Sequence, residues 1–450
     1  MSIFGKLDPT IIPLDLSENQ FEIYNKIARN YSHTFLFESL TGPEELAETS
    51  IMGFDPDILV KGYFDKVEII NKSGKTKTIK TKDPFDVIKN ILHKTNLQTY
   101  RYLGGAVGFV NYDAIRIWEK IPQRYDVQQP IMEFGIYYDG LLYDNKEKKL
   151  YYFYYNKDRS GDLKITKNEF SQFEIGDVTS NLNEQEFSDM VEKAKKYIEQ
   201  GDVFQVVLSR KFSFEGKGDH LNIYRVLRNL NPSPYLYHMK LNERTVIGAS
   251  PEMLVRITDR IVETFPIAGT RKITSDEKEN EKMKEELKRD EKELAEHTML
   301  VDLGRNDIGR VCKYGTVRMN SLMEVKRFSH VQHMVSHVIG DLDQKYDMID
   351  AFKAVFPAGT VSGAPKVRAM EIIDELEPES RGAYSGAVGY FSFNGCCDFA
   401  IAIRSIFLTK NGGFVQAGAG IVSDSIPHNE FKETEHKAEG MIQALKEAGN

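Results

Sequence analysis

Two stretches near the start of the chain alternate between apolar and polar residues, which is the pattern of a half-buried β-strand. The first runs from Asp57 to Lys82 and contains a Lys-Ser-Gly-Lys turn, and the second runs from Tyr137 to Tyr155. Residues 156–183 are polar, charged and poor in aliphatic side chains. We therefore predict a β-rich N-terminal lobe over residues 1–155, a linker over residues 156–183 and a second region over residues 184–450.

The second region mixes helical and extended patterns. Apolar residues recur at helical spacing from Glu184 to Gln200 and the pattern stops at Gly201, after which Val203 to Arg210 predicts a strand. Asp276 to Glu296 is so densely charged that it predicts an exposed helix laced with ion pairs. Helices interspersed with antiparallel strands, without regular βαβ alternation, indicate the α+β class.

The two regions share a short, similar sequence of five residues. Gly105 to Phe109 reads Gly-Ala-Val-Gly-Phe, and Gly386 to Tyr390 reads Gly-Ala-Val-Gly-Tyr. Both predict buried, glycine-rich strands, which is compatible with two similar β-lobes packed together. We therefore expect two interlocked lobes, built on antiparallel sheets flanked by helices, with the active site in the cleft.

Composition narrows the function classes. The chain has 450 residues, 41% of them hydrophobic, and a net charge of -8, with no long basic run. This charge argues against nucleic acid or an anionic membrane surface as a partner. The three cysteines include an adjacent pair and form no Cys-x-x-Cys, so neither disulfides nor a zinc site are indicated. Without a signal-like or membrane-spanning stretch, we expect a soluble cytoplasmic protein.

Two short acidic pairs are the strongest candidates for chemistry. Glu293 and Glu296 are three residues apart, as are Glu430 and Glu433, so each pair places two carboxylates on one helical face. If the two helices face each other, the oxygens suit Mg²⁺. The alternative is a pair of solvated helix faces, which such spacing commonly produces in an acidic chain.

Two glycine-rich segments invite a nucleotide interpretation that fails. Gly418-Ala419-Gly420 follows an apparent strand, but Ser423 stands where a dinucleotide fingerprint needs its third glycine. What remains is a strand that a ligand can approach closely, with amides that can meet an anion. Gly359 to Lys366 lacks the Gly-Lys-Ser/Thr of a phosphate loop but leads into a helix, with Pro365 at the first helical position. Its hydroxyls, on Thr360 and Ser362, mark a candidate anion site.

Isolated polar residues complete the candidates. Arg404 is a charge within an otherwise apolar strand and requires a partner, either structural or an anionic ligand. His330, His333 and His337 lie close together, and we place His330 and His337 on one helical face. They lack the Glu between histidines four apart that zinc metalloproteases use, so one functional histidine is favoured over a zinc cluster.

Taken in order, the motifs of the second region resemble those of the chorismate-utilising enzymes, and specifically the large subunits of anthranilate synthase. The resemblance covers most of residues 184–445. The matching segments are Gly201 to Arg210, Asn231 to Tyr235, Gly248 to Glu252, Pro266 to Thr270, Glu296 to Asp307, Gly359 to Met370, Tyr384 to Tyr390 and Gln416 to Ile421. Leu36 to Ser39 and Gly104 to Asp113 extend it, more weakly, into the first region.

The resemblance implies a reaction of chorismate with ammonia that gives anthranilate and pyruvate. It implies Mg²⁺ held by Glu296 and Glu433, with Glu293 and Glu430 in support, partly through water. Glu252 matches the general acid and His333 the histidine of aromatisation and pyruvate loss. The substrate-binding positions that it implies are Thr360, Tyr384, Arg404, Gly418, Ala419, Gly420 and Lys437.

Two positions separate the branches of this family. Isochorismate and salicylate synthases carry a lysine base where this chain has Gln205, which cannot activate water. Aminodeoxychorismate synthases commonly carry a nucleophilic lysine at the position of Ala268. The resemblance therefore favours anthranilate synthesis, with aminodeoxychorismate synthesis as the alternative within the enzymes. A catalytically inactive anion-binding regulatory module is the alternative outside them.

The resemblance further implies regulation and a partner. A site for inhibitory tryptophan would use Glu38, Ser39, Asn231, Pro232, Ser233, Pro234 and Tyr235, although Phe37 replaces the usual leucine and the two prolines could simply make a turn. No cysteine lies in a Gly-x-Cys-x-Gly context. We therefore expect ammonia from a glutamine amidotransferase subunit, in a heterotetramer, or from free ammonium.

Overall fold

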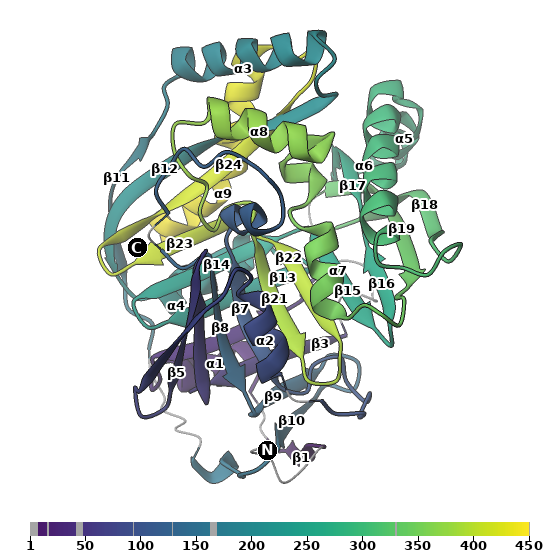
Figure 1. The fold of residues 1–450 in the computed structure, drawn as a ribbon. Helices are drawn as coiled ribbons and strands as arrows, with labels where there is room; N and C mark the ends of the chain where they lie inside the picture. Colours follow the sequence, from purple (N-terminus) through teal and green to yellow (C-terminus); the bar gives the residue numbers. More distant parts are fainter. Residues whose placement is uncertain are drawn as a thin grey trace.

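The computed structural model describes residues 8–15, 18–41, 48–92, 94–127, 129–162, 169–328 and 331–449. Within these ranges two sheets of twelve strands each, antiparallel throughout, form the body of the protein (Figure 1). Helices pack around them, as the α+β prediction expected. None of the described helices is long and apolar enough to cross a membrane.

The first sheet carries one wall of the functional site. Its path, in spatial order, is β1 (Thr10–Leu14), β10 (Lys149–Tyr154), β9 (Asp139–Asp144), β3 (Thr49–Phe54), β2 (His33–Glu38), β13 (Tyr235–Leu241), β14 (Arg244–Ser250), β23 (Ser405–Thr409), β24 (Gly412–Ile421), β12 (Gln205–Gly218) and β11 (Phe173–Ser180), with β20 (Gly363–Ala364) paired to β12.

The second sheet carries the opposite wall. Its path is β17 (Ile267–Lys272), β19 (Val331–Asp341), β16 (Ile261–Thr264), β15 (Met253–Thr258), β22 (Cys397–Ile401), β21 (Ala387–Ser392), β7 (Gly105–Val110), β8 (Met132–Tyr137), β4 (Ile58–Gly62), β5 (Lys66–Asn71) and β6 (Thr76–Lys80), with β18 (Arg318–Arg327) paired to β19.

The helices cover the outer faces and the end of the molecule near the site. In Figure 1, α3, α8 and α9 gather around β12 and β24, while α5 and α6 flank β17 and β19. The helices are α1 (Gln20–Ala28), α2 (Phe85–Ile91), α3 (Glu184–Glu199), α4 (His220–Leu230), α5 (Glu277–Arg289), α6 (Glu291–Gly309), α7 (Met348–Val355), α8 (Lys366–Leu376) and α9 (Pro427–Glu447), with 3₁₀ turns η2 (Tyr112–Ile117), η3 (Ser160–Asp162) and η4 (Gly359–Val361).

The two halves of the sequence are interlocked, because each sheet takes strands from both. In the first sheet β2 pairs with β13, and in the second β7 pairs with β21. The two similar glycine-rich segments form the pairing of β7 with β21, in which Gly108 lies opposite Gly389. A Cβ on Gly389 would lie 2.1 Å from the carbonyl oxygen of Asp398, so the close contact of neighbouring backbones requires glycine there.

Three local predictions need correction. The linker predicted over residues 156–183 is wrong for residues 173–180, which form β11 and pair with β12. The charged segment from Asp276 is two helices, because Asp290 interrupts it and caps α6 by accepting from the amide of Glu293. The segment that carries His333 and His337 was predicted to be helical but is a strand, β19. His330 lies outside the described residues.

Candidate active site

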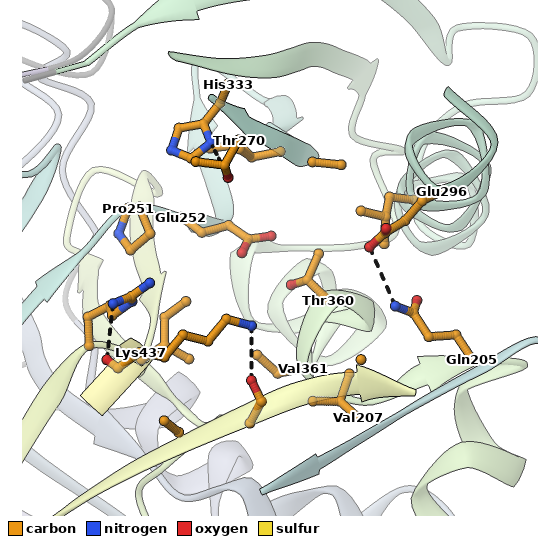
Figure 2. A pocket seen from close by; sticks show the side chains of 18 of the residues that line it. Gln205, Val207, Pro251, Glu252, Thr270, Glu296, His333, Thr360, Val361 and Lys437 are labelled. Carbon is orange, nitrogen blue, oxygen red and sulfur yellow. Dashed lines mark hydrogen bonds between the residues drawn. The ribbon is translucent and has the colours of Figure 1, made fainter. Parts of the chain in front are cut away.

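A cavity of about 240 Å³ lies where the two sheets meet at α6 and α9. Figure 2 shows its side chains converging from β12, β17, β19, α6 and η4 on one central space. The predicted site residues that line it are Gln205, Glu252, Glu296, His333, Thr360, Tyr384, Arg404, Gly418, Gly420 and Lys437. The fold therefore gathers residues that are up to 232 positions apart in the chain, from Gln205 to Lys437.

Glu252 presents a carboxyl group at the centre of this cavity, directly before β15 (Figure 2). Burial raises the pKa of Glu252 to about 7, although the ammonium of Lys437 opposes the shift. Thr360 faces the same carboxyl from η4. A carboxyl group with this pKa is substantially protonated near neutral pH and can donate a proton, as a general acid must.

His333 provides a base at the edge of the cavity. Its Nδ1 lies 3.1 Å from the carbonyl oxygen of Gly269 and 3.1 Å from Thr270 Oγ1. Because a carbonyl oxygen only accepts, Nδ1 carries the hydrogen, and Nε2 keeps its lone pair. Burial lowers the pKa of His333, which keeps the imidazole neutral. The carbonyl is aimed by a bulge in β17, where Gly269 has φ 65°.

The glycines of β24 make room for neighbouring side chains. A Cβ on Gly418 would lie 2.8 Å from the hydroxyl of Tyr384, and one on Gly420 would lie 2.5 Å from Gln205 Nε2. Lys437 Nζ donates to the Gly418 carbonyl at 2.9 Å, which places the backbone of Gly418 on the edge of β24 that faces the cavity. Ala419, predicted with them, does not line the cavity, because its side chain points into the hydrophobic core on the other face.

Arg404 supplies a cation that the described part of the chain does not neutralise with an ion pair. It was predicted within a strand but lies between β22 and β23, with φ 51°. Its Nη1 donates to the carbonyl oxygen of Lys437 at 3.0 Å. Burial lowers the pKa of Arg404, with Tyr384 and Glu433 partly offsetting the effect. A desolvated guanidinium on a cavity wall is a binding group for an anion, as the sequence suggested.

The acidic pairs lie on two helices, as predicted, but they are not equivalent. Glu296 lines the cavity and accepts from Gln205 Nε2 at 3.5 Å, and burial together with Glu293 raises its pKa. Glu293 accepts from Arg271 at 3.1 Å, and Glu433 pairs with Lys437 at 2.5 Å. Burial also raises the pKa of Glu430.

These four carboxylates do not assemble into a closed metal cage. Within the described ranges, no three His, Cys, Asp or Glu side chains are grouped closely enough to hold an ion. The donor set nevertheless fits Mg²⁺, because it consists of carboxylate oxygens on helices α6 and α9 and includes two acids whose charged forms burial disfavours. A bound cation would offset the free-energy cost of burying these two charged carboxylates.

Some predicted residues prove to be structural. Ser362 donates its hydroxyl to the carbonyl of Ala358 and does not reach the cavity, whereas Thr360 does. Pro365 caps α8, which begins at Lys366, one residue later than predicted. His337 stacks on Phe265 with ring centroids 4.0 Å apart, so it is a packing residue.

A second cavity, of about 50 Å³, contains part of the predicted inhibitor site. β2 and β13 are paired so that Glu38 faces Leu236, which brings Ser39 beside Pro234 and Tyr235. The Ser39 hydroxyl is buried and forms no hydrogen bond with the described residues. Asn231, Pro232 and Ser233 form the preceding turn and do not line this cavity.

Glu38 also lines this second cavity, but its carboxylate is already hydrogen-bonded to α4. It accepts from Arg228 at 2.6 and 3.0 Å and from the Tyr224 hydroxyl at 2.6 Å. These bonds tie β2 to α4, so we assign Glu38 a structural role. A tryptophan ligand would meet Ser39, Pro234 and Tyr235 instead.

Sequence reasoning missed a buried ion pair beneath the main cavity. Arg381 and Glu377 lie on neither a recognisable motif nor a regular helix face, and no sequence signal marks them. Arg381 also donates to the carbonyl oxygens of Val361 and Val207, both at 2.7 Å. The pair therefore joins η4 to β12, two walls of the cavity.

Comparison with known proteins agrees with this geometry. Residues 17–443 match the family of the chorismate binding enzyme. The chain is 43% identical to anthranilate synthase component 1 of Methanothermobacter marburgensis over 95% of this chain and 93% of that one. It is 40% identical to aminodeoxychorismate synthase component 1 of Bacillus subtilis, over 94% and 93%.

A solved structure has the same fold. Anthranilate synthase component I from Streptococcus pneumoniae superposes with a TM-score of 0.77 at 38% identity, covering 88% of this chain and 92% of that one. The α+β architecture of interlocked antiparallel sheets predicted from the sequence is thereby confirmed. The chain belongs to the family of chorismate-binding enzymes.

Proposed function

We propose that the protein is the synthase component of anthranilate synthase, which converts chorismate and ammonia to anthranilate and pyruvate. One observation carries the proposal. The main cavity holds a carboxyl whose pKa is about 7 (Glu252), a neutral imidazole (His333) and a desolvated guanidinium (Arg404) around one space. These are the groups required to bind a dianion, expel a hydroxyl and remove a carbon-bound proton.

The first step is the substitution of the ring hydroxyl by ammonia. Glu252 donates its proton to the departing hydroxyl, which leaves as water, because hydroxide itself is a poor leaving group. Ammonia forms a carbon–nitrogen bond beside the carbon that bears the ring carboxylate. Arg404 and the backbone amide of Gly418 hold the enolpyruvyl carboxylate, and Tyr384 closes the wall beside it.

The second step is loss of pyruvate. His333 acts in this step, where a base removes the proton from the ring carbon that carries nitrogen. The bond between the ring and the enolpyruvyl oxygen then breaks, and protonation of the enolate gives pyruvate. Aromatisation drives this elimination.

Mg²⁺ is the proposed cofactor, held by Glu296 and Glu433 with Glu293 and Glu430 in support. When bound, it would neutralise the ring carboxylate and withdraw electron density from the ring. The support for this is the donor chemistry of the four acids and the cost of leaving Glu296 and Glu430 charged and buried without a cation.

Two cavity residues favour anthranilate over the products of related enzymes. Gln205 is an amide and cannot deprotonate water, whereas ammonia is a nucleophile without deprotonation. Ala268 lines the cavity and has no nucleophile to add to the ring. Sequence similarity alone does not decide between the two activities, because the identity to the aminodeoxychorismate synthase is 40% and that to the anthranilate synthase is 43%.

Regulation and partnership complete the proposal. Tryptophan would bind in the second cavity, where the buried Ser39 hydroxyl lacks a partner among the described residues. A glutamine amidotransferase subunit would supply ammonia, in a heterotetramer. The component naming of the relatives supports a partner chain.

A direct assay tests the reaction. The purified chain is given chorismate, Mg²⁺ and ammonium, and anthranilate is followed by its fluorescence. Accumulation of a non-aromatic amino adduct by the unaltered protein would instead identify an aminodeoxychorismate synthase. An inactive binding module would give neither product, and Glu296→Ala or Glu433→Ala would leave its function unchanged.

A further inference from the structure

A third cavity lies behind Glu252, on the side away from the main cavity. Its volume is about 30 Å³, and it shares Glu252, Leu300 and Thr360 with the main cavity. It runs between α6 and the segment that leads into η4. Glu252 therefore borders two spaces, one that receives the proposed substrate and one that does not.

The other end of this cavity carries a second carboxylate. Asp307, near the end of α6, lines it and accepts from Lys366 Nζ at 2.6 Å. The side chains of Asp307 and Lys366 are 11% and 12% exposed, and the adjacent Asn306 and Arg310 are exposed. The cavity thus extends from the general acid to a charged pair that reaches solvent.

The space is adequate for water. One water needs roughly 10–15 Å³ of this kind of volume, so the cavity has room for about two. Polar groups stand along it: the Glu252 carboxyl, the Asp307 carboxylate and the buried Thr360 hydroxyl, which faces the Glu252 carboxyl. Such groups are what an internal water needs to bind.

We infer that this cavity is a water-filled proton path from Asp307 to Glu252. The inference rests on the proposed function, in which Glu252 loses its proton to the departing hydroxyl in every turnover. Bound substrate fills the main cavity and separates Glu252 from bulk water there. Glu252 then takes a proton from the adjacent water. Each water along the path takes a proton from the next, and a proton from solvent enters at the outer end, beside the Asp307–Lys366 ion pair.

The charged groups around the path are compatible with proton movement from the Asp307 end toward Glu252. Lys437 faces Glu252 from α9, while Lys366 and Arg310 face Asp307 from α8 and from the end of α6. Burial raises the pKa of Asp307, and the ammonium of Lys366 opposes the shift. Asp307 acts through Glu252 and does not touch substrate, so it is a positioning residue.

Two variants test the path. Asp307→Asn removes the carboxylate at the outer end of the path and is expected to lower kcat about threefold to tenfold, to raise the solvent deuterium isotope effect on kcat and to leave the KM for chorismate unchanged. Gly304→Ala narrows the third cavity, since its Cβ would lie 3.3 Å from Thr264 Cγ2. It is expected to lower kcat and to raise the isotope effect in the same way as Asp307→Asn. Gly309→Ala on the same helix meets no atom within 4 Å and is the control.

The outcomes separate the inference from the function on which it rests. If the unaltered protein makes no anthranilate from ammonium, the proposed function fails. If it does, and both Asp307→Asn and Gly304→Ala retain its kcat and isotope effect, the proton path is wrong. Should Asp307→Asn fold poorly because Lys366 loses its partner, Gly304→Ala alone decides. A fall in kcat with an unchanged isotope effect would indicate a structural role and would also overturn the inference.

Discussion

Arg381 and Glu377 form a bidentate ion pair beneath the main cavity, with Nε–Oε2 at 2.9 Å and Nη2–Oε1 at 2.7 Å. The Arg381 side chain is 1% exposed and that of Glu377 is 4% exposed. Glu377 also accepts from the Ser209 hydroxyl at 2.7 Å. The pair thus orders β12, on which Gln205 stands, and the loop that carries Thr360.

Removal of one charge from this pair should destabilise the protein strongly. Glu377→Gln leaves the Arg381 guanidinium buried without a counter-charge, and we expect a loss of about 3–5 kcal/mol in the free energy of unfolding. Denaturant unfolding measures it. Glu375→Gln, at an exposed position near the end of α8, should change stability by less than about 0.5 kcal/mol. Equal effects of the two variants would contradict the role of the pair.

The rate should depend on pH through Glu252 and His333. Glu252 must be protonated and its pKa is about 7, so kcat falls as the pH rises through 7. His333 must be neutral, and burial lowers its pKa from the ordinary value of an imidazole, so kcat also falls at acidic pH, once this group is protonated. Glu252→Gln should lower kcat about 10²–10⁴-fold and abolish the alkaline limb of the profile. An alkaline limb that survives this substitution would assign the proton donor to another group.

His333→Ala should separate the two steps of the reaction. Without the imidazole, substitution by ammonia can still proceed, but removal of the ring proton cannot. We therefore expect the non-aromatic amino adduct to accumulate, as detected by chromatography and mass spectrometry, with little anthranilate. His337→Ala, on the same strand but packed against Phe265, is the control and should yield anthranilate. Normal anthranilate production by His333→Ala would remove this residue from the mechanism.

Metal dependence should appear in stability as well as in activity. Burial raises the pKa of Glu296 and of Glu430, so their contribution to stability is present in acid and is lost as the pH rises through those pKa values. We expect Mg²⁺ to raise Tm, and to raise it more at pH 8 than at pH 5. Chelation of the metal should abolish activity.

Variants of the acids test the same site. Glu296→Gln and Glu433→Gln should greatly increase the Mg²⁺ concentration required for half-maximal activity and diminish the Tm response. Glu439→Gln, an exposed position of α9, should behave as the unaltered protein. A Tm response to Mg²⁺ that is intact in Glu296→Gln would place the metal elsewhere.

Tryptophan inhibition should depend on Ser39 and not directly on the Glu38 carboxylate. Ser39→Ala removes the unpartnered hydroxyl of the second cavity and should weaken inhibition by about twofold to tenfold, the worth of one hydrogen bond. Glu38→Gln should mainly reduce Tm, since it weakens the bonds to α4. Inhibition curves and thermal unfolding of both variants distinguish these effects. Unaltered inhibition of Ser39→Ala would exclude this cavity as the tryptophan site.

Local patterns predicted much of the secondary structure and of the main site. Alternation identified the strands near Asp57 and Tyr137, and motif resemblance identified Glu252, His333 and Arg404, which the fold brings together. The histidine segment was misassigned because its apolar and polar residues follow neither period strictly, so helical and extended periods fit equally well over a short window. β11 was missed because its side chains are largely exposed and polar at a sheet edge.

The sequence by itself determined the class of fold and the two acid-bearing helices, because these follow from residue type and short-range spacing. It also determined which groups can act on chorismate, through the resemblance of its motifs to those of a known family. Only the tertiary structure decided that β2 pairs with β13 and β7 with β21, that Glu38 binds Arg228, and that Asp307 stands at the far end of a cavity from Glu252. These relationships join residues distant in the chain. They depend on packing and strand register, which no local pattern specifies.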